Sequence, residues 1–240
     1  ADNIAKAVVL GGFTEFNFAE SAALTSVKWE GAAGSWARGI QPEGSRFGYE
    51  LFMNCPKLQF VWGNPGYGPA PPQALDAFKD LTNCFSGCTA FNGDLDSWYV
   101  RNVKNFNSCF DGATSFNQDI SGWLAYGPTA AENMDSMFMN ATSFDQPINA
   151  WNVSNVKLFT SMFEGATAFN KPLNAWDVSG ANTEAGNGTS YVMNYMFHIA
   201  SSFSQDLTQW CVSNIPSEPS FFSRASSLTA SQLPVWGTCP

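Results

Sequence analysis

One apolar frame recurs along the chain, and a phenylalanine marks its position in eight copies. These residues are Phe18, Phe52, Phe85, Phe110, Phe138, Phe163, Phe197 and Phe222. In the five central copies a tryptophan follows 13 residues later, as Trp98 follows Phe85, and the basic repeat is 25 residues long. Repeats of this kind are typical of stacked coils, in which each coil buries its apolar side against its neighbours. We therefore expect residues one repeat apart to lie on top of one another.

The pattern inside one repeat predicts a short helix followed by a short strand. In 157–163 the apolar residues have the spacing of one helix face: Leu158, Phe159, Met162 and Phe163. Gly165 can end that helix, and 170–176 has the pattern of a strand. The predicted fold class is an α/β solenoid, a right-handed leucine-rich-repeat-like coil of about eight turns with one helix and one parallel strand per turn.

We expect a single repeat domain over 1–240. Residues 1–77 form irregular N-terminal capping turns, 78–215 the regular repeats, and 216–240 a C-terminal capping turn. Terminal repeats are commonly irregular. The excess over 25 residues falls in insertions, chiefly 31–46, 63–74 and 180–190, which we expect to be loops on one edge of the stack.

The charge balance narrows the classes of partner. The net charge is −9 with only 11 lysines and arginines, which argues against nucleic acid and against anionic membrane surfaces. No apolar run approaches 18 residues, so we expect no transmembrane segment in this chain. The first residue is Ala1 rather than Met, and we expect a processed or trimmed product.

Six cysteines fall into three pairs within the repeat frame. The candidate disulfides are Cys55 with Cys88, Cys84 with Cys109, and Cys211 with Cys239. Neighbouring strands lie about 4.8 Å apart, within the Cα separation that a disulfide accepts. The last pair is the favoured one. The alternative is that cysteines replace Met or Ala as small core residues.

Three sequons offer glycosylation candidates at Asn140, Asn152 and Asn187. With the cysteines, they favour an oxidising, non-cytosolic compartment: extracellular or cell-surface, with an organelle lumen as a further option.

The sequence offers no catalytic residue, metal site or cofactor site that we can single out. The one histidine, His198, has the position of an exposed structural residue and cannot form a multi-histidine metal site. Three aspartates share a column, Asp94, Asp119 and Asp206, but prolines interrupt it, so a calcium site is disfavoured.

Two further sets of equivalent residues, one per repeat, predict surfaces that contact other molecules. A row of hydroxyls starting at Thr89, Thr114 and Thr142 has the spacing of an ice-binding face, although turn capping explains it better. The small, polar exposed positions predict a broad contact surface, with binding-face candidates Gln118, Gln146, Lys171 and Gln205.

The phrase Phe-x-Gly-Ala-Thr-Ser-Phe-Asn-Gln-(Asp/Pro)-(Ile/Leu)-x-x-Trp-x-Val-Ser-Asn-Val, drawn from 110–123, 138–156 and 163–179, resembles the surface-protein repeat of the BspA-like family, a relative of leucine-rich repeats. The resemblance is strong over 84–215 and weaker outside it. It implies a leucine-rich-repeat-like solenoid on surface-exposed, lipid-anchored or secreted proteins used for adhesion or protein interaction, and it implies no catalytic residues.

Two functions follow as hypotheses. The first is a non-catalytic extracytoplasmic recognition or adhesion module that binds protein or glycan through its sheet face and insertion loops. The alternative is a structural or scaffolding subunit of a larger surface or membrane-associated assembly.

Overall fold

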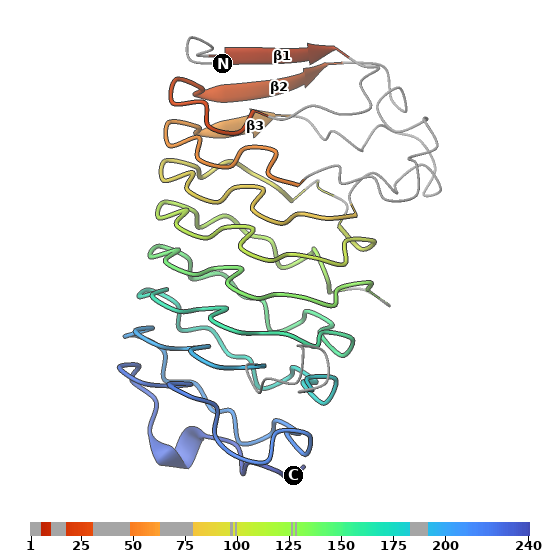
Figure 1. Ribbon diagram of the computed structural model, residues 1–240, viewed down its shortest axis with the longest axis vertical. Helices are drawn as coiled ribbons and strands as arrows, with labels where there is room; N and C mark the ends of the chain where they lie inside the picture. The colour runs from red at the N-terminus through yellow and green to blue at the C-terminus, as the bar shows by residue number, and fades with distance from the viewer. Residues whose placement is uncertain are drawn as a thin grey trace.

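The computed structural model describes residues 6–10, 18–30, 49–62, 79–96, 98, 100–125, 127, 129–182 and 192–240. Three short strands form a parallel sheet in the order β1 (Lys6–Leu10), β2 (Ser26–Glu30) and β3 (Phe60–Trp62). Lys6 pairs with Ser26, and Ser26 pairs with Phe60. A 3-10 turn, η3 (Ala230–Gln232), lies in the last coil. Figure 1 shows the coils lying one below another from the N-terminal to the C-terminal end.

Beyond β3, the coils are joined by backbone hydrogen bonds at alternate residues. Ser161 N–H donates to Asn194 O at 2.9 Å, and Gly165 N–H donates to His198 O at 2.8 Å. The residues between them close tight turns, as when Glu164 N–H donates to Ser161 O at 3.1 Å. Each coil is thus tied to the next as in a parallel sheet while its own chain keeps turning.

Two residues with positive φ in each central coil allow bonds to the next coil to alternate with bonds inside the coil. Relative to the frame phenylalanine they lie two residues before it and two residues after it, as Ser161 (φ 53°) and Gly165 (φ 68°) flank Phe163. Positive φ recurs before the phenylalanine at Glu50, Asn83, Ser108, Ser136, Ser161 and Tyr195, and after it at Glu20, Asn54, Gly87, Gly112, Asn140, Gly165 and Ile199. A residue in this conformation interrupts a right-handed helix.

The predicted α/β solenoid with one helix and one strand per turn is therefore wrong. The described residues contain no α-helix, and their named strands are confined to β1, β2 and β3. The segment 157–163, predicted as a helix, instead consists of successive turns broken at Ser161. Its apolar spacing comes from tight turns that bring Phe159, Met162 and Phe163 to the buried side of the coil.

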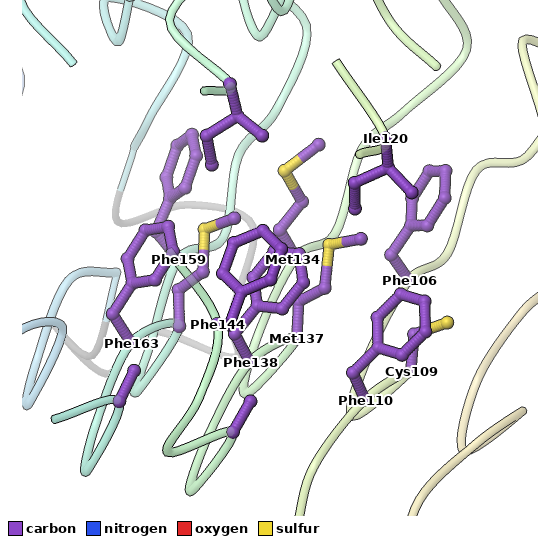
Figure 2. Packing of buried hydrophobic residues seen from close by; sticks show 14 of the residues in the cluster. Phe106, Cys109, Phe110, Ile120, Met134, Met137, Phe138, Phe144, Phe159 and Phe163 are labelled. Carbon is purple, nitrogen blue, oxygen red and sulfur yellow. The ribbon is translucent and has the colours of Figure 1, made fainter. Parts of the chain in front are cut away.

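The core consists of continuous rows of aromatic rings. Frame phenylalanines stack face to face down the molecule, with Phe110 and Phe138 at 5.6 Å and Phe138 and Phe163 at 5.7 Å between ring centroids. A second row contains Phe91, Phe116, Phe144, Phe169 and Phe203, with centroids 5.6–6.0 Å apart. Figure 2 shows Phe110, Phe138 and Phe163 of the first row, with Phe144 of the second row next to Phe138 and with Cys109 and Met137 beside the first row. The expectation that residues one repeat apart lie on top of one another is confirmed for these rows.

Tryptophans close the apolar side of the coils and also bond the backbone. The Trp123 indole N–H donates to Leu95 O at 3.0 Å in the preceding coil. Trp151, Trp176 and Trp210 make the equivalent bond to Ile120, Ile148 and Leu173. Each indole thereby satisfies its donor while its ring is almost fully buried.

The register slips by one residue in the last coil. In earlier coils the frame phenylalanine N–H donates to the residue before the next frame phenylalanine, as Phe163 N–H donates to Met196 O. Phe197 N–H instead donates to Phe222 O at 2.8 Å. Phe222 therefore occupies the row of residues that precede the frame phenylalanines, which we call the cysteine and methionine row: Cys84, Cys109, Met137, Met162 and Met196. Its ring meets that of Phe197 edge-on at 86°. Phe222 is thus not a true eighth member of the frame.

The glycines at the second left-handed position supply a matched test of the turn geometry. Gly112 and Gly165 both have φ of +68°, but a Cβ on Gly165 would lie 2.5 Å from Asn140 Oδ1, whereas one on Gly112 would lie 3.8 Å from its nearest neighbours. We expect Gly112→Ala to lower the free energy of unfolding by about 1–2 kcal/mol, the left-handed penalty alone. Gly165→Ala should lower it further, as measured by chemical denaturation.

The variant Asn140→Gly separates the two effects. In the Gly165→Ala background it should recover the excess loss because it removes the clashing side chain, and in the Gly112→Ala background it should recover nothing. Equal losses from the two alanine variants would contradict this description of the turn.

Candidate binding face

A ladder of side-chain oxygens runs along the face next to the second phenylalanine row. We call Asn92, Asn117, Asp145 and Asn170 the polar ladder; each directly follows a phenylalanine of that row. The Oδ1 atom of each accepts the backbone N–H of the equivalent residue in the next coil, at 2.9 Å for the first three and 3.1 Å for Asn170 with Ser204. Side chains here make the coil-to-coil bonds that a strand backbone would otherwise make.

Three of the predicted binding-face residues are bound to this ladder. Gln146 Nε2 donates to Asn117 O at 2.9 Å and to Asn117 Oδ1 at 2.8 Å. Gln205 makes the same pair of contacts with Asn170, at 3.1 and 2.8 Å. Lys171 Nζ lies 2.7 Å from Asp145 Oδ2. The side chains are therefore held in fixed positions along the face.

Gln118 lies half-exposed in the same column as Gln146. The structure thus places all four predicted candidates on one face. Sequence reasoning missed the ladder residues beside them, although the recurring Phe-Asn pair was the available signal.

The aspartates of the predicted column stabilise local turns of the backbone. Asp94, Asp119 and Asp206 each accept the backbone N–H two residues ahead, at 2.8–2.9 Å. These bonds, from Ser121 and Thr208, lower the pKa of Asp119 and Asp206. Across the described residues no group of three His, Cys, Asp or Glu side chains is arranged to hold a metal ion.

The hydroxyl column also bonds the backbone. Thr114 Oγ1 donates to Thr89 O at 3.2 Å, and Thr142 Oγ1 donates to Thr114 O at 3.4 Å. This arrangement favours the turn-capping interpretation over an ice-binding face, because the hydroxyls are directed at the preceding coil.

One family model matches the chain, over residues 79–190 and 186–238. Its description is "Mycoplasma protein of unknown function, DUF285". The chain belongs to the DUF285 family. The matched residues include the whole polar ladder and every described coil after β3. No curated protein and no solved structure matches the chain.

The cysteines of this DUF285 chain divide into one disulfide and four buried thiols. Cys211 and Cys239 are joined, with Cα atoms 4.1 Å apart, as favoured from the sequence. The proposed bridges Cys55–Cys88 and Cys84–Cys109 are not formed: all four residues are free and buried.

The four thiols lie in an apolar environment that keeps them protonated. Cys55 Sγ donates to Phe18 O at 3.0 Å, and Cys88 Sγ donates to Phe52 O at 2.9 Å. Burial raises the pKa of Cys55 to about 11 and the pKa of Cys84 and Cys109 well above its ordinary value. These residues act as small core side chains, the alternative that the sequence left open.

The remaining predicted sites are scattered. Asn140 is exposed at a left-handed turn, and Asn152 is half-buried, with Nδ2 donating to Gly127 O at 3.2 Å. Asn187 and the insertions 31–46 and 63–74 lie outside the described residues, as does most of 180–190. In the described part of the chain, no helix is long and apolar enough to span a membrane.

Two aspartate carboxylates are partly buried, and the pKa of each is raised. Burial raises the pKa of Asp135, although its Oδ1 accepts Thr160 N–H at 2.7 Å. Burial also raises the pKa of Asp111; a side-chain bond from Asn140 opposes the rise, and the nearby charge of Glu164 adds to it. Both carboxylates cost stability when ionised.

The polar ladder can be tested at Asn117, whose Oδ1 accepts both Asp145 N–H and Gln146 Nε2. Asn117→Ala should lower the free energy of unfolding by about 1–3 kcal/mol, because a backbone donor loses its partner. Gln118→Ala, one residue along, should change it by less than about 0.5 kcal/mol. Chemical denaturation measures both, and a loss at Gln118 as large as that at Asn117 would refute the ladder.

The pH dependence of stability can be tested at Asp135. Its raised pKa means that ionisation disfavours the fold as pH rises from about 4 through the folded-state value. Asp135→Asn keeps an oxygen for Thr160 N–H and removes the charge. The variant should therefore be more stable than the wild type at pH 7, and the gain should vanish below about pH 4.

Asp119→Asn is the control, because its pKa is shifted in the opposite direction. It should be no more stable than the wild type at pH 7. Thermal unfolding between pH 3 and pH 8 measures both variants; a gain for Asp135→Asn that is independent of pH would contradict the electrostatic cause.

Proposed function

We propose that this chain is a non-catalytic recognition or adhesion module that acts outside the cytosol and binds a protein or glycan through the face of the polar ladder. The observation that carries the proposal is the regular fixing of Gln146, Gln205 and Lys171 by the ladder. Side chains that are ordered before binding lose little entropy when a partner arrives, so they favour affinity.

The chemistry of this face suits a neutral, hydrogen-bonding partner. Amide side chains supply both donors and acceptors, which match sugar hydroxyls and peptide groups equally well. The low share of charged residues, 13%, gives no attraction for a polyanion. The repetition of this face over several stacked coils suits an extended partner more than a small enclosed ligand.

The Cys211–Cys239 disulfide supports a place in an oxidising compartment, since such bonds persist mainly in secreted and surface proteins. In this proposal the polar ladder replaces the predicted sheet face, because the described residues of the central coils form no named strand.

A structural subunit of a larger surface assembly is the second candidate. Ile199 and Phe221 favour it, because they are large apolar residues left 46% and 42% exposed on neighbouring coils. Apolar side chains gathered in this way mark contacts with other protein chains.

Glycan and peptide arrays probed with the whole chain test the first candidate. We expect a defined set of ligands to bind the wild type, and Gln118→Arg to weaken that binding at least about tenfold, because it places a long cation on the neutral face. Ser115→Arg adds the same side chain at an exposed residue next to Thr114 of the hydroxyl column and should bind as the wild type does. Equal binding by both variants would show that this face is not the contact surface.

A further inference from the structure

Ile199 occupies a backbone conformation that suits it poorly. It lies two residues after the frame phenylalanine, where the four preceding coils have Gly87, Gly112, Asn140 and Gly165. Its φ is 59°. Glycine and asparagine accept this region readily, whereas a β-branched side chain is a costly exception. The residue is also 46% exposed, so burial does not repay the strain.

Its neighbours form a partly exposed aromatic cluster with a cation. Tyr195 (φ 60°) and Phe221 (φ 54°) take the other left-handed position in the last two coils. Their rings stack at 5.0 Å between centroids with an interplanar angle of 9°. The Arg224 guanidinium lies 5.0 Å from the Phe221 ring centroid, and His198 Nδ1 lies 2.9 Å from Arg224 O. We call Tyr195, His198, Ile199, Phe221 and Arg224 the terminal aromatic patch.

The terminal aromatic patch contains larger side chains than the same edge of earlier coils. The position of Tyr195 is held by Ser108, Ser136 and Ser161 in the three coils before it. Tyrosine and arginine beside an exposed aliphatic side chain are the residues that dominate the energetics of protein interfaces.

The charge along this edge changes from acidic to basic toward the C-terminal end. The position after each frame phenylalanine holds Asp111, then Met139, Glu164 and His198. Because of the register slip, Arg224 follows His198 in this column, as shown by Ile199 N–H donating to Arg224 O at 3.0 Å. His198 therefore lies between an acidic coil and a basic coil.

A two-fold axis through the coil of His198 would place each charge opposite its counterpart. Along this edge the residues follow the order Glu164, His198, Arg224 in one copy. In an antiparallel second copy the order is reversed, so Glu164 of each copy faces Arg224 of the other. Such an edge is complementary to itself, which is the requirement of a closed dimer interface. A chain with net charge −9 otherwise repels its own kind, so the match favours this orientation over others.

We propose that the terminal aromatic patch is the centre of a two-fold interface between two copies of this chain. Tyr195, Ile199 and Phe221 pack around the axis, and Arg224 of each copy pairs with Glu164 of the other. The interface is separate from the polar ladder and does not depend on the ligand bound there.

Sedimentation equilibrium of the whole chain, up to about 100 µM, tests the interface. The wild type should form a dimer that weakens as salt is raised. Ile199→Asn should weaken the dimer at least about tenfold while the melting temperature of the protein rises or stays constant, because asparagine accepts the left-handed conformation. Val235→Ser, at another apolar residue with 71% exposure, should leave the dimer unchanged.

Charge exchange tests the orientation. Arg224→Glu and Glu164→Arg should each weaken the dimer at least about tenfold, and the double variant should restore it. A monomeric wild type across the whole concentration range would overturn the proposal, and so would capture of a different protein by a patch that never self-associates. Failure of the double variant to restore the dimer, or a loss with Val235→Ser equal to that with Ile199→Asn, would also overturn it.

Discussion

The structure depends on two contacts that each frame phenylalanine makes with the next coil: a backbone hydrogen bond and a ring stack. Phe110 donates its backbone N–H to Met137 O at 2.9 Å, and its ring stacks on that of Phe138 at 5.6 Å. Backbone pairing and ring stacking therefore join the same two coils at the same residue. Burying such a ring contributes about 1.5–3 kcal/mol. The left-handed residues on either side of each phenylalanine allow both contacts, because they let a turning chain present alternate N–H groups to the next coil.

The periodicity of the sequence was sufficient to predict the rows but not the path of the chain between them. Phe110, Phe138 and Phe163 stack as their spacing predicts. The helix was predicted from apolar residues at 158, 159, 162 and 163, and turns that reverse at a left-handed residue give the same spacing. Gly112 and Gly165 at one fixed position carried the information that distinguishes the two, since glycine is the residue most tolerant of positive φ. The cysteine columns were placed correctly on the core side, whereas spacing alone could not show which thiols are joined.

The polar ladder explains why the described residues of the central coils lack the expected strands and why the side chains of the proposed binding face are partly engaged within the chain. Asn117 Oδ1 accepts the N–H of Asp145, which in a regular sheet would bond a backbone carbonyl. The asparagine side chain thus replaces a strand pair, and Gln146 then fastens to the same asparagine. A face built this way combines support of the fold with display of donors and acceptors. The sequence predicted the displayed residues, but not that the same residues help to hold the coils together.

The slip of one residue in the last coil links the end of the aromatic row to the appearance of an apolar surface. Phe222 moves into the cysteine and methionine row and meets Phe197 and Trp236 edge-on, so the face-to-face stack stops there. Its N–H bonds Pro219 O within the same coil, as the N–H of Met196 bonds Met193 O one coil earlier, so the backbone of Phe222 keeps the pattern of its new row. The same shift carries Phe221 to an outward left-handed position beside Tyr195. Had the frame continued unchanged, Phe222 would have extended the buried stack and Phe221 would have taken the inward methionine position. Termination of the core and creation of the terminal aromatic patch are therefore two results of one change in register.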